Sequence, residues 1–183
     1  MRLVYRALTI TFAFTACSTA TVHETAVAGT SCNQMAIIGD SLIANGNQAL
    51  HRQFPTAIIN ARGGRLVSDG WEAAQGIKES NPLVDCWIIA LGTNDISHHL
   101  DVSTMQTAID HLRSTLVGRV WWVLPQFAPA AQLDPTVFDY LVPANVIRIS
   151  TNPVLADFIG DGIHRTPEGY EHRADALRRY VAD

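Results

Sequence analysis

The stretch "MAIIGDSLIANG", residues 35–46, decides how the rest of this chain is interpreted. A short apolar run ends at Gly39, and Asp40, Ser41 and Leu42 follow before the chain becomes polar. Such a run, bounded by turn residues, is typical of a buried strand. Ser41 is therefore either a nucleophile at a strand end or part of an ordinary strand-to-helix turn. A serine nucleophile needs a base, an orienting acid and oxyanion donors, so the other residues of the chain must distinguish the two.

The rest of the chain alternates short apolar runs with amphipathic stretches. After the strand at 35–38, further strands are predicted at 57–61, 87–91, 120–124 and 146–149. Helices are predicted from about 45 to 54, over 68–79, along 105–116 and after Thr166, with a loop and a short helix over 127–144. The adjacent Trp121 and Trp122 should pack on opposite faces of their strand. Strands that alternate with helices predict an α/β fold with a parallel sheet covered on both faces.

Composition limits the classes of protein to which the chain can belong. Its 183 residues suit one domain, and 48% hydrophobic with 16% charged residues indicates a globular protein. The net charge of −4 gives no sign of nucleic-acid binding, which usually needs a basic face. His98 and His99 are adjacent, so their side chains diverge, and they have no partner at zinc-ligand spacing. We expect no metal, no cofactor, no nucleic-acid partner and a monomeric protein.

The N-terminus has the features of an export signal. Arg2 and Arg6 precede the apolar stretch 7–16, which is too short for the roughly 20 residues that span a bilayer. "FTAC" resembles a bacterial lipobox, in which Cys17 would become lipidated, whereas "AVA" at 26–28 fits cleavage by simple secretion. We predict a signal peptide over 1–17, a linker over 18–31 and a folded domain over 32–183. The protein is thus expected to be an anchored lipoprotein or secreted, and a cytosolic protein is the remaining alternative.

Polar, glycine-containing segments follow three of the predicted strands, and a fourth precedes the last helix. They are "GDSL" at 39–42, "NARGGR" at 60–65, "GTND" at 92–95 and "DGIH" at 161–164. Ligands of parallel α/β sheets bind at the carboxyl ends of the strands, where the first three segments lie. His164 can act as a base for a serine, and Asp161 can orient it. Backbone N–H groups and the amide of Asn94 can stabilise an oxyanion.

These four segments, in this order, resemble the SGNH (GDSL) hydrolase superfamily over residues 35–181. The resemblance implies a flavodoxin-like α/β/α sandwich whose five parallel strands have the order 2-1-3-4-5. It makes Ser41 the nucleophile, His164 the base and Asp161 the residue that orients His164. Ser41, Gly64 and Asn94 would form the oxyanion hole. Gly64 is preferred to the glycine before it because the family glycine usually follows the "NA" by a few residues.

Other polar residues near these segments are expected to have structural roles. Asp40 and Asp95 should shape loops or cap helices rather than take part in chemistry. Arg62 and Arg65 flank the glycines and are interpreted as solvated loop charges, with contact to an anionic substrate as the alternative.

The implied strand order also bears on the cysteines. It makes the first and third strands neighbours, so Cys32 and Cys86 would lie near the starts of adjacent strands at similar depth. Exported chains permit disulfides, and adjacent strand starts can meet the Cα–Cα limit of roughly 7 Å. We predict a disulfide between Cys32 and Cys86, with two buried free cysteines as the alternative.

The sequence thus predicts an exported serine esterase, or acyltransferase, that works through an acyl-enzyme. By resemblance, its substrates would be small acyl or acetyl esters, such as O-acetylated polysaccharides of the cell envelope. A lysophospholipase or thioesterase is the alternative within the same chemistry. A catalytically silent surface lipoprotein that binds envelope glycan is the alternative outside it.

Overall fold

The computed structural model describes residues 32–182. The predicted signal peptide 1–17 and linker 18–31, with the lipidation candidate Cys17, lie outside the described residues. None of the helices within the described range has the length and apolar character needed to cross a membrane.

Five parallel strands form one sheet with the order β2-β1-β3-β4-β5. The strands are β1 (Gln34–Gly39), β2 (Ile58–Ala61), β3 (Val84–Ala90), β4 (Arg119–Val123) and β5 (Ile147–Ile149). The predicted fold class and strand order are therefore confirmed.

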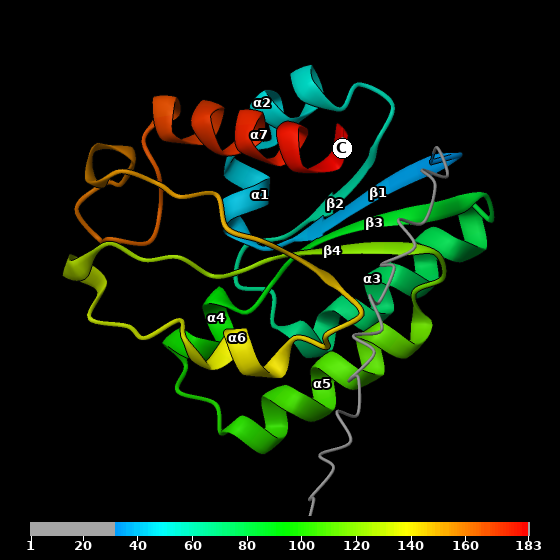
Figure 1. Ribbon diagram of the computed structural model, residues 1–183, viewed down its shortest axis with the longest axis horizontal. Helices are drawn as coiled ribbons and strands as arrows, with labels where there is room; N and C mark the ends of the chain where they lie inside the picture. Colours follow the sequence, from blue (N-terminus) through cyan, green and yellow to red (C-terminus); the bar gives the residue numbers. More distant parts are fainter. Residues whose placement is uncertain (1–31, 183) are drawn as a thin grey trace, which may run out of the picture. The chain divides into compact units, whose positions relative to one another are not determined.

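Helices cover both faces of this sheet (Figure 1). One face is covered by α1 (Ser41–Asn45), α2 (Asn47–Gln53) and α7 (Pro167–Ala182). The other is covered by α3 (Val67–Ser80), α5 (Val102–Thr115) and α6 (Val137–Leu141). The remaining elements are α4 (Thr93–Ser97) and the 3₁₀ turns η1 (Pro129–Ala131) and η2 (Leu155–Asp157).

Alternate residues of each strand enter two separate cores. Ile37 packs in the core under α1, α2 and α7, whereas Ile38 packs in the core under α3 and α5. Trp121 and Trp122 divide in the same way, as predicted, and both are fully buried. The indole N–H of Trp122 donates to the carbonyl of Leu91 at 3.2 Å, so this large side chain is buried without an unpaired donor. Burial on both faces explains why the strands are continuous apolar runs.

The first helix differs from the prediction, which placed one helix from about residue 45 to 54. The chain turns helical at Ser41, and Gly46 separates α1 from α2. The signal for this early start is Asp40, whose side chain accepts the N–H of Leu42 at 2.9 Å and caps α1. The short helix α4 was also missed, because five residues are too few to show a helical period.

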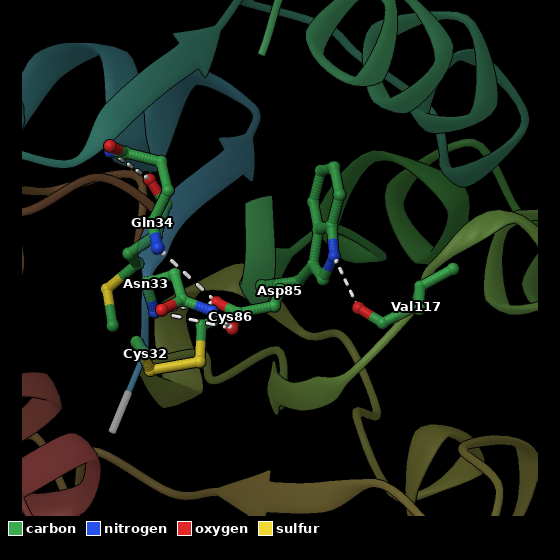
Figure 2. The surroundings of a disulfide bond; sticks show 8 residues. Cys32, Asn33, Gln34, Asp85, Cys86 and Val117 are labelled. Carbon is green, nitrogen blue, oxygen red and sulfur yellow. Dashed lines mark hydrogen bonds between the residues drawn. A yellow bond between two sulfur atoms is a disulfide. The ribbon is translucent and has the colours of Figure 1, made fainter. Parts of the chain in front are cut away.

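The disulfide between Cys32 and Cys86 joins the start of β1 to β3 (Figure 2). The two Cα atoms are 5.7 Å apart, within the range that a disulfide spans. Beside the bridge, the carboxylate of Asp85 accepts the backbone N–H of Asn33 at 3.0 Å and its side-chain amide at 2.7 Å. The chain that leads into β1 is thus fixed to β3 by a covalent bond and by hydrogen bonds.

Removing the bridge should destabilise the domain without changing its fold. We expect the double variant Cys32→Ala with Cys86→Ala to lose about 2–4 kcal/mol of unfolding free energy, because the bridge restricts the unfolded chain. Urea unfolding monitored by circular dichroism measures this loss. A reducing agent should lower the stability of the parent chain by a similar amount and leave the double variant unchanged. Equal stability of parent and variant would contradict a structural bridge.

Candidate active site

Ser41 lies where β1 ends and α1 begins, at the carboxyl edge of the sheet. Gly39, the last residue of β1, has Ile43 packed directly over it. A Cβ added at Gly39 would lie 2.1 Å from Cγ1 of Ile43, so only glycine permits this close approach of helix to strand. Ser41 is the first residue of α1, and its backbone N–H has no acceptor among the residues that the structure describes.

The loop between η2 and α7 places Asp161 and His164. Its base is closed by an antiparallel bridge between Phe158 and Arg165. Within the loop, Oδ1 of Asp161 accepts the N–H of Ile163 at 2.8 Å and that of His164 at 2.9 Å. These bonds fix the carboxylate relative to the backbone that carries the imidazole.

Asp161, His164 and Ser41 form one hydrogen-bonded chain, although 123 positions separate His164 from Ser41 in the sequence. Nδ1 of His164 lies 2.7 Å from Oδ2 of Asp161, and Nε2 lies 2.9 Å from Oγ of Ser41. The structure therefore brings together the three residues that the sequence singled out. Their geometry is that of a nucleophile, a base and an orienting acid.

The ionisation of Asp161 fixes the direction of these bonds. Partial burial raises its pKa, but hydrogen bonds from the His164 ring and from the N–H groups of Ile163 and His164 outweigh burial and hold the pKa below its ordinary value. Asp161 is therefore an acceptor-only carboxylate, and Nδ1 of His164 donates to it. Nε2 is left as the acceptor for the Ser41 hydroxyl, which is the role of a general base.

The remaining predicted residues reach the same edge of the sheet from two other turns. The side-chain amide of Asn94, at the start of α4, donates to the carbonyl of Arg65 at 3.0 Å and lies 3.5 Å from Asp40. The turn that contains Gly64 is held against β1, because the Arg62 N–H donates to the Gly39 carbonyl at 3.2 Å. The N–H of Gly64 has no acceptor among the described residues. Asn94 thus lies between this turn and the start of α1.

Among the comparisons with known proteins, the comparison of structures gave matches, whereas the comparisons of sequence gave none. No protein-family model and no curated protein matches the sequence. The catalytic domain of peptidoglycan O-acetyltransferase A from Streptococcus pneumoniae is similar, with TM-score 0.66 and 16% identity over 81% of this chain and 92% of that one. A protein of the G-D-S-L lipolytic family from Desulfitobacterium hafniense gives TM-score 0.62 and 14% identity over 80% and 98%. The chain has the SGNH hydrolase fold.

An acetylxylan esterase from Geobacillus stearothermophilus is a further neighbour, with TM-score 0.56 and 18% identity over 82% of this chain and 94% of that one. TM-scores of 0.56–0.66 at identities of only 14–18% establish a shared fold, whereas activity depends on the residues of the site.

Two buried carboxylates support the site from below, as expected for Asp40 and Asp95. Both are fully buried. Asp95 accepts the N–H of Val67 at 3.1–3.2 Å and so holds the start of α3 beside α4. Burial raises the pKa of Asp40 above its ordinary value, although the bond from Leu42 and the charge of Arg173 oppose the rise. Burial also raises the pKa of Asp95, to about 6.

The prediction of solvated arginines is wrong for Arg65. Its side chain is buried and donates to the carbonyl of Gly39 at 3.1 Å, and to the carbonyl and side chain of Asn60 at 2.6 and 2.7 Å. Arg65 therefore fastens its turn to the ends of β1 and β2 rather than facing solvent. Arg62 is exposed, as expected, and pairs with Asp69 at 2.8 Å.

A second polar group, which no sequence motif indicated, lies near the site and contains Asp157, Arg165, His172 and Arg173. The signal for Arg173 was present, since it lies three residues after Tyr170 and four before Leu177, on the apolar stripe of α7.

No cluster of three or more potential metal ligands was found within residues 32–182.

Replacing the buried Asp95 should remove a pH dependence of stability. Its pKa is raised in the folded state, so the stability that it contributes is complete below about pH 4 and is lost as the pH rises through about 6. Asp95→Asn does not titrate and should gain about 2 kcal/mol relative to the parent between pH 4 and pH 7. Urea unfolding at both pH values measures the gain. Asp110→Asn, on the exposed side of α5, is the control, and an equal effect of Asp95→Asn at both pH values would contradict the assignment.

Proposed function

We propose that the protein is an exported serine esterase that removes small acyl groups, above all acetyl groups, from the hydroxyls of cell-envelope carbohydrates. The observation that supports this most strongly is the hydrogen-bonded chain of Asp161, His164 and Ser41 at the carboxyl edge of an SGNH-fold sheet.

In the proposed reaction, Oγ of Ser41 attacks the ester carbonyl while Nε2 of His164 takes the hydroxyl proton. Asp161 stabilises the imidazolium that forms. The imidazolium then protonates the departing alcohol, which leaves the acyl group on Ser41. His164 next removes a proton from water, or from a second alcohol, which attacks the acyl-enzyme and releases the acyl group. Water gives hydrolysis, and an alcohol gives transfer.

The negative charge that develops on the ester oxygen needs donors that are already in place. We assign this role to the unpaired N–H of Ser41, the N–H of Gly64 and the side-chain amide of Asn94. Asn94 uses one amide proton on the carbonyl of Arg65, and the other makes only a long contact of 3.5 Å with Asp40, which a substrate oxygen can replace. Preorganised donors of this kind commonly supply the largest part of the catalysis of acyl transfer.

The exposure of the site supports access by an ester of a bulky alcohol. The side chains of Asp161 and His164 are 41% and 32% exposed, so the base can be reached by an ester on a polymer. The names of two neighbours with this fold, a peptidoglycan O-acetyltransferase and an acetylxylan esterase, concern acetyl groups on carbohydrates. Export, through a signal at 1–17 and a lipid on Cys17, would place the enzyme at its substrate. A disulfide is typical of proteins outside the reducing cytosol.

A cavity with apolar residues in its wall supports the alternative that the substrate is a lipid ester. This cavity of about 390 Å³ lies beside α4, which carries Asn94, and is lined by His99, Leu100, Met105, Leu133 and Val137 among others. A longer acyl chain could occupy it in a lysophospholipase or thioesterase.

Replacing Ser41 tests the enzyme directly. Ser41→Ala should lower turnover of p-nitrophenyl acetate by about a thousandfold or more, because no other group can form the acyl-enzyme. The matched control is Ser80→Ala, at the exposed C-terminal end of α3. Unchanged turnover in Ser41→Ala would favour a silent, glycan-binding lipoprotein. Faster turnover of p-nitrophenyl octanoate than of the acetate by the parent chain would favour the lipid-ester alternative.

A product assay separates hydrolysis from transfer. The parent chain should release acetate from purified O-acetylated envelope polysaccharide, whereas Ser41→Ala should release none. With a de-O-acetylated polysaccharide and p-nitrophenyl acetate as donor, new sugar O-acetyl groups detected by mass spectrometry would identify a transferase. Activity on p-nitrophenyl acetate without either product would exclude this carbohydrate as substrate.

A further inference from the structure

Two buried arginines near the base of the loop that carries His164 lack hydrogen-bond partners. Arg165 is 5% and Arg173 is 7% exposed, yet neither guanidinium donates a hydrogen bond to any residue that the structure describes. Their Nε atoms are fully buried and unpaired. Buried charges are normally paired, because an unpaired one costs several kcal/mol. Arg165 packs over the Phe158 ring, with its Cζ 4.6 Å from the ring centroid, but no side chain within residues 32–182 supplies hydrogen-bond acceptors to the two neighbouring guanidinium groups, which indicates a missing partner.

Both arginines line one cavity of about 250 Å³ between α7 and the segment that follows β5. Other residues of its wall are Thr151, Asn152, Asp157 and Arg179. The volume is about eight times the ~30 Å³ that one water molecule occupies in the liquid, so the cavity can hold a ligand larger than a simple inorganic ion.

The single buried acid in this wall forms a long ion pair with Arg165 but does not hydrogen-bond to either arginine. Oδ2 of Asp157 lies 4.0 Å from Nη1 of Arg165, beyond hydrogen-bond distance. The Asp157 carboxylate instead accepts the Val154 N–H at 3.1 Å and contacts Nδ1 of His172 at 2.8 Å. Burial, together with repulsion from Arg173, lowers the pKa of Arg165 to about 10, which still leaves it charged at neutral pH.

The charges and polar groups of the wall define the missing partner. Within the wall, three arginines, with Arg179 at the rim, face the carboxylates of Asp157 and Asp175, which leaves one positive charge in excess. Asp40 lies outside the wall and attracts Arg173, but burial raises the pKa of Asp40 and so favours its neutral form.

A ligand with one negative charge would balance the charges of the cavity wall. A carboxylate suits this role, because a guanidinium group can form two parallel hydrogen bonds with its two oxygens. The side chains of Thr151 and Asn152 add hydrogen-bonding groups suited to ligand hydroxyls.

We propose that this cavity binds a hydroxylated monocarboxylate of sugar size, such as a uronic acid, through Arg165 and Arg173. The cavity wall contains none of Ser41, Asp161 and His164, so the site is separate from the proposed catalytic residues. The cavity nevertheless lies near the proposed catalytic residues. Arg165 directly follows His164 in the sequence, and the charge of Arg173 acts on Asp40, which directly precedes Ser41. The proposal does not depend on esterase activity, because its test measures binding.

Titration calorimetry on the full chain with its disulfide intact tests the site. D-glucuronate at constant ionic strength should bind saturably, and D-glucose, which lacks the carboxylate, should bind at least about tenfold more weakly. Inorganic phosphate should also bind more weakly than glucuronate. Equal affinities for glucuronate and glucose, or tighter binding of phosphate, would overturn the proposal.

Variants on one helix locate the binding. Arg173→Met should weaken glucuronate binding about tenfold or more, because a charged hydrogen-bonding partner is lost. Arg178→Met, which replaces an exposed residue of α7 outside the cavity, is the matched control and should bind as the parent does. Thermal unfolding establishes that each variant is folded. If Arg173→Met does not fold, the variant Arg179→Met at the rim of the cavity tests the proposal instead. Glucuronate binding to Arg179→Met as tight as to the parent chain would contradict the site.

Discussion

The close packing of α1 on the end of β1 is the contact on which the proposed site depends. Because Gly39 has no Cβ, Ile43 can lie directly on the strand end, and the chain turns from strand to helix within one residue. Asp40 then caps the helix with a buried carboxylate. The result is a serine at the edge of the sheet whose backbone N–H remains unpaired and whose hydroxyl faces His164.

The other parts of the site are fixed to this turn from several directions. Arg65 fastens the turn after β2 to the carbonyl of Gly39, and Asp95 holds α3 beside α4. On the remaining side, the loop of His164 is positioned by the carboxylate of Asp161 and by the Phe158–Arg165 bridge at its base. Polar groups, of which Arg65 and Asp95 are buried, thus set the geometry, and the two apolar cores hold the elements from which these groups extend.

Prediction from sequence worked best where a residue's role is local. The apolar runs gave each strand to within a few residues, and Pro167 and Glu168 marked the start of α7. It failed for Arg65, which is charged and directly follows two glycines, because its burial depends on the ends of two strands that meet only in the folded sheet. Arg173 was missed although the stripe of α7 includes it, since an arginine on an apolar face is not counted as core.

By itself, the sequence determined the α/β class, the five strands and the four polar segments, three at strand ends and one before the last helix, because these follow from local periodicity and turn chemistry. Through the resemblance it also determined the order of the strands and the pairing of Cys32 with Cys86. Only the tertiary structure decided that Nε2 of His164 lies 2.9 Å from Oγ of Ser41, and that Arg165 and Arg173 share one cavity. Distances between residues far apart in the chain depend on how the layers pack, which no local pattern encodes.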